Sequence, residues 1–325
     1  MTAIPSPKLV TVFGGSGFLG RHIVRALAND GWRIRVAVRR PNSAHFLRPA
    51  GRVGQIQIVK ANVLDGAAVL AALEGAEAAI NLVGILSERG RQMFDAVHAG
   101  AAANIARAAV QQGTSRLLHV SAIGISPSAK AHYLRSKAEG EARVRETFAE
   151  ATVFRPSLVF GPEDDFFNRF AWLARLSPFL PLIGGGKTRF QPVYVGDIAR
   201  AAVTALREGA TAGKTYELGG PEVMSFRQVL ELVLKVTHRR RMLVPIPFGL
   251  ARVQAAFLGM LPNPLLTLDQ VRMLETDNVV APGALTLSDL GIMPEAAEAI
   301  IESYLWRFRK EGQFEDDVTR GEASV

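Results

Sequence analysis

Residues 10–20 read VTVFGGSGFLG, and this stretch decides the fold of the chain. A short apolar and β-branched run, typical of a buried strand, leads directly into four glycines spread over seven residues. Glycine destabilises the interior of a strand or helix because it loses the most conformational freedom on folding. This density of glycine therefore indicates a place where the backbone turns sharply or comes unusually close to another group.

Gly14, Gly17 and Gly20 fall where an expected first strand (8–13) meets an expected first helix (18–31). At such a junction one glycine permits the turn, one lets the backbone touch a phosphate, and one lets the helix pack closely on the strand. The amino end of the helix then offers unpaired N–H groups and a partial positive charge to a pyrophosphate. The spacing predicts a dinucleotide-binding turn, with a plain glycine-rich turn as the alternative.

Strand-like and helix-like segments continue to alternate as far as residue 162. Further strands are expected at 32–40, 56–63, 76–85, 115–124 and 151–162, and helices at 65–75, 95–113 and 137–148. Because no hairpin turn joins one strand to the next, the pattern favours parallel strands with helices on both faces. The right-handed crossover rule then predicts an α/β fold with a Rossmann-type doubly wound parallel sheet.

Composition narrows the function classes. The 325 residues are 48% hydrophobic and 21% charged, with a net charge of +8 and no cysteine. A disulfide scaffold, a thiol nucleophile and a cysteine-bound metal are excluded, and we expect no metal site. The excess of Lys and Arg suits an acidic partner, but no nucleic-acid-binding motif accompanies it, so we expect no nucleic acid. The first residues do not resemble a signal peptide, so we expect a cytoplasmic protein.

The end of the second expected strand bears on which dinucleotide is bound. Most NAD sites have an Asp or Glu there to hold the ribose hydroxyls, whereas this chain has Arg39 and Arg40. Two guanidiniums suit the oxygens of a 2′-phosphate, which a carboxylate would repel. The sequence therefore predicts NADP(H) rather than NAD(H), with a solvated Arg pair as the alternative. We place the NADP(H)-binding domain at 1–160, with return elements at about 188–220, and a smaller mixed C-terminal domain for a partner or substrate at 161–325.

Further motifs follow in order: ANVLD at 61–65, INLVGI at 80–85, YLRSK at 133–137, FRPSLVFGPEDDF at 154–166, QPVYVGDIA at 191–199 and TYELGGPE at 215–222. With GGSGFLG, this ordered set resembles the extended and atypical short-chain dehydrogenase/reductases over most of the chain. The resemblance implies that the cofactor is contacted by Gly14, Ser16, Gly17, Phe18, Leu19, Gly20, Arg39, Arg40, Asn62, Val63, Leu82, Val83, Gly84, Ser121, Tyr133, Lys137, Pro156, Ser157 and Leu158.

Tyr133 and Lys137 are the candidate catalytic pair, because residues four apart lie on one face of a helix. A Lys ammonium beside the phenol would lower the Tyr pKa and make the Tyr a general acid or base for a carbonyl–alcohol interconversion. In the family the Lys also holds the nicotinamide ribose. Ser121 is the candidate third member, although a shift of two residues would put Ile123 in its place. An exposed Tyr and Lys without chemistry are the alternative.

A narrower resemblance covers 133–171 and 262–280, which look like the NADPH-binding accessory subunits of respiratory complex I and their bacterial relatives. It implies that NADPH is held mainly as a structural element, and that the chain docks on peripheral-arm subunits near the inner membrane. It also implies a peripheral association with that membrane through complex I. The alternative is a soluble NADP-dependent reductase or epimerase acting on a small sugar-like or ketone substrate.

Residues 238–266 join three arginines to an apolar segment. The segment is too short, and too interrupted by prolines, to span a bilayer. A basic run beside an apolar helix suits an interfacial or partner-facing surface, and contact with anionic lipid is one expectation. A helix buried in the core of the second domain is the alternative.

Overall fold

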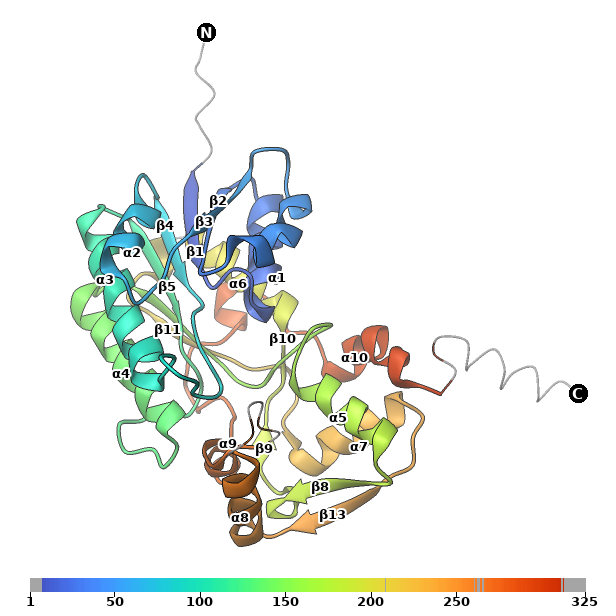
Figure 1. Ribbon diagram of the computed structural model, residues 1–325. Coiled ribbons are helices and arrows are strands. Elements are labelled where there is room, and N and C mark those ends of the chain that lie inside the picture. Colours follow the sequence, from blue (N-terminus) through green and yellow to red (C-terminus); the bar gives the residue numbers. More distant parts are fainter. Residues whose placement is uncertain are drawn as a thin grey trace, which may run out of the picture. The chain divides into compact units, whose positions relative to one another are not determined.

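Seven parallel strands form the main sheet, in the order β11-β6-β5-β4-β1-β2-β3 (Figure 1). The computed structural model describes residues 8–207, 209–259, 261, 264, 266–310 and 312. The strands are β1 (Leu9–Phe13), β2 (Arg33–Val38), β3 (Ile56–Lys60), β4 (Ala78–Asn81), β5 (Arg116–Val120), β6 (Thr152–Pro156) and β11 (Thr215–Leu218). The chain moves outward through β1, β2 and β3, then returns to start β4 beside β1. The predicted Rossmann-type doubly wound sheet is therefore confirmed.

Helices cover both faces of this sheet (Figure 1). One face carries α1 and α6, which pack on each other, and the other carries α2, α3 and α4. Their bounds are α1 (Phe18–Asn29), α2 (Gly66–Leu73), α3 (Ala101–Gln111), α4 (His132–Thr147) and α6 (Val195–Arg207). Shorter helical segments are η1 (Pro41–Ala50), η2 (Asp95–Gly100), η4 (Gly209–Thr211) and η5 (Ser288–Leu290).

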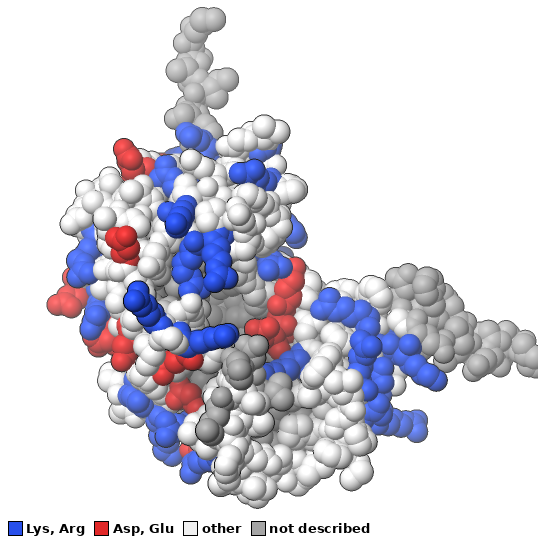
Figure 2. All heavy atoms as spheres, viewed as in Figure 1, with Lys and Arg blue, Asp and Glu red and all other residues white. Residues whose placement is uncertain are grey.

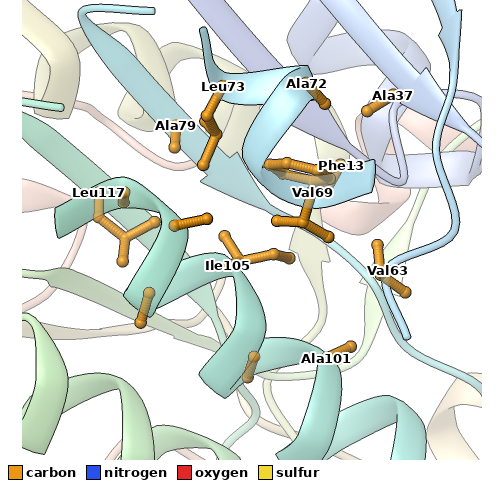
Figure 3. Close-up of a cluster of buried hydrophobic side chains, with 14 of the residues drawn as sticks. Phe13, Ala37, Val63, Val69, Ala72, Leu73, Ala79, Ala101, Ile105 and Leu117 are labelled. Atoms are coloured by element: carbon orange, nitrogen blue, oxygen red, sulfur yellow. The ribbon is translucent and has the colours of Figure 1, made fainter. Parts of the chain in front are cut away.

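A hydrophobic core fills the space between the sheet and the α2–α4 layer (Figure 3). Phe13 at the end of β1 lies against Val69 of α2, with Ile105 of α3 beside them. All three side chains are fully buried. Because parallel strands covered on both faces read as continuous apolar runs, this core explains why each strand could be recognised in the sequence. It also holds the carboxyl ends of β1 and β4 in fixed positions.

Three predicted elements differ from the observed ones. The helix expected at 137–148 begins five residues earlier, at His132, so Tyr133 lies in its first turn. The helix expected at 95–113 starts with a π-helical segment, η2, before α3. The strand expected at 151–162 divides into β6 and a two-residue strand, β7 (Val159–Phe160).

The remaining elements build a smaller second unit. It contains α5 (Phe166–Leu176), β8 (Phe179–Ile183), η3 (Gly184–Gly186), β9 (Arg189–Phe190), β10 (Val193–Tyr194), β12 (Met224–Ser225), α7 (Phe226–Val236), β13 (Met242–Ile246), α8 (Phe248–Leu258), α9 (Leu268–Met273), α10 (Ala297–Leu305) and η6 (Trp306–Phe308). Its strands pair two by two, as β7 with β10, β8 with β13, and β9 with β12. Aromatic side chains, including Phe160, Phe167 and Phe226, fill its core.

The chain passes between the two units several times. The first unit comprises 1–156, 195–218 and 281–293, and the second comprises 157–194, 219–280 and 294–325. Residues 281–293 return to the edge of the main sheet, where the Glu217 N–H of β11 donates to the Leu285 carbonyl at 2.8 Å. The sequence analysis did not anticipate this return.

The approach of α1 to the turn after β1 generates a stability prediction. A Cβ added at Gly20 would lie 2.4 Å from the Gly14 carbonyl oxygen and 2.6 Å from the Gly15 Cα. Since both atoms are backbone, Gly20→Ala must push α1 away, and we expect the free energy of unfolding in urea to fall by about 1–3 kcal/mol. Gly66→Ala is the matched control, because nothing lies within 4 Å of its added Cβ. That control should be neutral or stabilising, and equal losses in the two variants would contradict this account.

Candidate functional site

The glycine turn after β1 lies at the point where the strand order of the main sheet reverses. Gly14 has a φ of +80°, which favours glycine, and the Gly17 N–H donates to the Gly14 carbonyl at 3.0 Å. A Cβ at Gly14 would lie 3.2 Å from the Leu82 carbonyl carbon and 3.3 Å from the Val83 nitrogen. The turn therefore packs the loop after β1 against the loop after β4, at the position where doubly wound sheets bind dinucleotides.

The amino end of α1 is open to a ligand. Gly17 is its N-cap and supplies no side-chain hydrogen bond, and no acidic residue stands in the first turn. Gly17 is exposed, while Ser16, Phe18 and Leu19 are half-buried. Orphan N–H groups with a positive helix end, and no capping carboxylate to compete, make this a suitable site for an anion.

Arg39 and Arg40 follow β2 directly, and both side chains are exposed. Among the described residues, neither guanidinium makes an ion pair or hydrogen bond. Arg40 contributes its carbonyl instead, which accepts from Ser43. Figure 2 shows Lys and Arg side chains gathered on the part of the first unit that carries β1, β2 and α1. Both guanidiniums are thus free to meet an anion.

The turns after β3 and β4 are held by side-chain hydrogen bonds. Asn62 accepts from the Leu64 N–H at 3.2 Å, and the Val63 carbonyl accepts from Asn104 of α3 at 3.0 Å. Asn81 accepts from the Val83 N–H at 3.1 Å. These bonds fix both loops at the carboxyl edge of the sheet.

Tyr133 and Lys137 lie on α4, but not in the electrostatic arrangement expected. Burial raises the pKa of Tyr133 to about 12, so the expectation that Lys137 lowers it is wrong. Lys137 is itself buried and donates from Nζ to the Val120 carbonyl at 3.1 Å. Burial lowers the Lys137 pKa to about 8, with Glu141 acting in the opposite direction. At neutral pH the phenol keeps its proton, and the raised pKa makes it a weaker proton donor than an ordinary Tyr.

Ser121 is buried directly after β5 and lies beside Glu141 of α4. Glu141 is about two helical turns beyond Tyr133. Burial alone would raise the pKa of Glu141, but hydrogen bonds and charge from Arg155, with Arg145, hold it below its ordinary value. The Arg155 Nη2 donates to the Glu141 carboxylate at 2.7 Å. The Ser121 hydroxyl itself is buried without a hydrogen-bond partner among the described residues, so it stays available to a ligand.

Two buried histidines belong to this region, and the sequence analysis named neither. His119 accepts at Nδ1 from Asn81 at 3.0 Å. His98 accepts at Nε2 from the Ile85 N–H at 3.1 Å and contacts the Ser136 hydroxyl from Nδ1 at 2.8 Å. Burial, then the charge of Lys137, lowers the pKa of each histidine to about 3. The only feature of the sequence that could have identified His98 is its position in an otherwise Ala-rich helical stretch.

The last three predicted cofactor-binding residues, Pro156, Ser157 and Leu158, lie where the chain leaves the first unit and enters the second. Pro156 ends β6 in the first unit, and its carbonyl accepts from the Ile123 N–H at 3.1 Å. Ser157 and Leu158 belong to the second unit. There the Ser157 hydroxyl donates to Asn278 and accepts from the Gln191 N–H.

The second unit has a surface of its own. On α8, Leu250, Val253 and Phe257 are 53%, 54% and 72% exposed, while Ala251 and Ala255 are buried. The helix therefore turns its small residues inward and presents a stripe of large apolar ones, here called the α8 stripe. The alternative of a fully buried core helix is wrong for this segment. Residues 260, 262, 263 and 265 of the same run lie outside the described residues.

None of the helices in the described part of the chain is both long enough and apolar enough to cross a membrane.

Comparisons with known proteins identify the family of this chain. Residues 10–219 match the model of the NAD dependent epimerase/dehydratase family. The chain is 36% identical to the Arabidopsis thaliana protein "NADH dehydrogenase [ubiquinone] 1 alpha subcomplex subunit 9, mitochondrial" over 94% of this chain and 79% of that protein. It is 34% identical to a "Ceramide reductase" of Caulobacter vibrioides over 61% of each chain.

A solved structure gives the same fold. The structure of MoeE5 in complex with UDP-glucose and NAD covers 96% of this chain and 99% of its own, with a TM-score of 0.68 and 17% identity. The likeness shows the fold alone. With the family match over 10–219, the resemblance to extended short-chain dehydrogenase/reductases is confirmed, and the chain belongs to the NAD dependent epimerase/dehydratase family.

Proposed function

We propose that the first unit binds NADP(H) as a structural element, and that the chain is an accessory subunit of respiratory complex I that does not turn the nucleotide over. The observation that carries the proposal is the state of the expected catalytic residues. Burial raises rather than lowers the Tyr133 pKa, and Lys137 donates one hydrogen bond to the Val120 carbonyl instead of supporting a phenolate. The Arabidopsis relative, named as a complex I subunit and similar over nearly the whole chain, supports the partner.

The residues present fit a dinucleotide. Gly14 and Gly20 let the turn, α1 and the loop after β4 pack closely, and the amino end of α1 is uncapped. When bound, the nicotinamide supplies hydride chemistry. The chain's own residues offer N–H groups of the turn for the pyrophosphate, Lys137 for the ribose, and Arg39 with Arg40 for the 2′-phosphate.

A second candidate is an NADP-dependent reductase. The similarity to a ceramide reductase favours it, as does the presence of Tyr133 and Lys137 one turn apart on α4. A phenol with a pKa of about 12 can still donate a proton to a carbonyl oxygen. Turnover with a carbonyl compound would select this candidate.

The cofactor preference follows from Arg39. NADPH should bind more tightly than NADH, because a charge-assisted contact with the 2′-phosphate contributes about 1.5–3 kcal/mol. Arg39→Asp should erase or reverse the preference, measured by titration calorimetry with both nucleotides. Arg33→Asp is the matched control, since it makes the same charge change at the exposed start of β2. Equal affinities of the parent for the two nucleotides would contradict the proposal.

The α8 stripe is the part of the second unit that we assign to the membrane or to membrane-proximal subunits of complex I. Residues 232–268 contain one Lys and four Arg but no Asp or Glu. An apolar stripe within a basic, carboxylate-free segment suits an anionic lipid surface. Figure 2 shows basic side chains in a row over the α5 and α7 side of this unit.

Phe257→Glu should weaken this association, because it puts a charge at the most exposed position of the stripe. We expect sedimentation with vesicles containing anionic lipid to weaken about tenfold or more, given the free energy of burying a Phe side chain. Co-migration with complex I should fall in parallel. Val53→Glu, at a fully exposed position of the first unit, should change neither. Loss of co-migration with unchanged vesicle binding would assign the stripe to a protein partner.

A further inference from the structure

We propose that His98 is the positioning residue of the dinucleotide site. Its imidazole joins the loop after β4 to the first turns of α4, and so sets how tightly the nucleotide is retained. This inference rests on the proposed function, because it explains how the same site is held in shape.

Three hydrogen bonds define the connection. The Ile85 N–H donates to His98 Nε2 at 3.1 Å, His98 Nδ1 lies 2.8 Å from the Ser136 hydroxyl, and that hydroxyl donates to the Tyr133 carbonyl at 2.9 Å. A backbone N–H can only donate, so Nε2 must carry a lone pair. The proton of the neutral ring is therefore on Nδ1, where it donates to Ser136. Each donor among these three hydrogen bonds meets an acceptor.

Two aromatic rings pack against the His98 imidazole, and Gly140 allows α4 to lie close to its backbone. Phe94 stacks on the imidazole with centroids 5.3 Å apart and planes 21° apart, and the Tyr133 ring packs on it perpendicularly with centroids 5.2 Å apart. A Cβ at Gly140 would lie 2.2 Å from the His98 carbonyl oxygen, so only a glycine there lets α4 approach η2 this closely. His98 is 2% exposed, and its π-helical segment is of a kind frequent at functional sites.

The connection bears directly on the cofactor segment. Leu82 and Val83 contact the glycine turn, and a Cβ at Gly84 would lie 3.4 Å from Lys137 Nζ and 3.8 Å from His98 Nε2. One ring therefore spans the loop that faces the nucleotide and the helix that carries the ribose-holding Lys. If it were removed, the loop could move while the rest of the sheet stayed intact.

The ring also stays neutral. The titratable groups that face it are Lys137, His119 and His132, and Tyr133 is beside it. Burial and then the charge of Lys137 lower the pKa of His98 to about 3. A protonated ring would set an N–H against the Ile85 N–H, so neutrality is what the geometry requires.

The test uses the full chain, with NADPH as the probe. In His98→Asn the side-chain amide can still donate to Ser136, but the acceptor for the Ile85 N–H is lost. In His98→Gln the side-chain oxygen can still accept from Ile85, but the donor to Ser136 is lost. Each should raise the Kd of NADPH about fivefold or more, because a buried partner is left unsatisfied. Ser136→Ala should act in the same direction with a smaller change in volume. His45→Gln, at an exposed position on η1, should bind like the parent.

The protonation of His98 can also be measured in the parent protein, so the inference can be tested even if the variants do not fold. Long-range proton–nitrogen NMR of the parent should show the His98 proton on Nδ1, with no titration through the neutral range. A proton on Nε2 would overturn the inference, as would folded His98 variants that bind NADPH like the parent. A parent that binds no NADPH would instead overturn the proposed function.

Discussion

The close approach of α1 to the turn that follows β1 is the constraint on which the rest of the first unit depends. With any side chain at Gly20, the helix would meet the backbone of Gly14 and Gly15. With the helix in place, its uncapped amino end lies where the strand order of the sheet reverses, which is the usual place of a dinucleotide in such folds. Glycine here costs conformational entropy, and in the proposed function a pyrophosphate would offset that cost by pairing the open N–H groups.

Burial explains why the presence of Tyr133 and Lys137 does not by itself imply a carbonyl–alcohol interconversion. Tyr133 and Lys137 have the expected spacing, yet desolvation moves the pKa of the phenol up and that of the ammonium down. Lys137 is balanced by a backbone carbonyl and by Glu141, which is in turn held by Arg155. The charges around α4 therefore stabilise one another.

The sequence predicted the sheet well because each buried parallel strand is a short apolar run between glycine turns and helices. Arg39, Arg40 and the glycine turn could be placed by the same logic, since their positions follow from local chain geometry. The His98 contacts could not, because they depend on α4 packing against η2, which a single glycine at 140 permits. Nor could the Glu141 contacts, because they depend on α4 packing beside Arg155 of β6. The Tyr133 pKa was predicted in the wrong direction because helical spacing gives proximity but says nothing of desolvation.

The central claim is that this chain retains its dinucleotide without using it. The most direct measurement follows the near-ultraviolet absorbance of reduced nicotinamide in the chain purified with its own nucleotide, after addition of carbonyl compounds, in parent and Tyr133→Phe. The account predicts stable absorbance and equal nucleotide content in both proteins. Rapid oxidation in the parent that Tyr133→Phe abolishes would contradict it and establish a reductase.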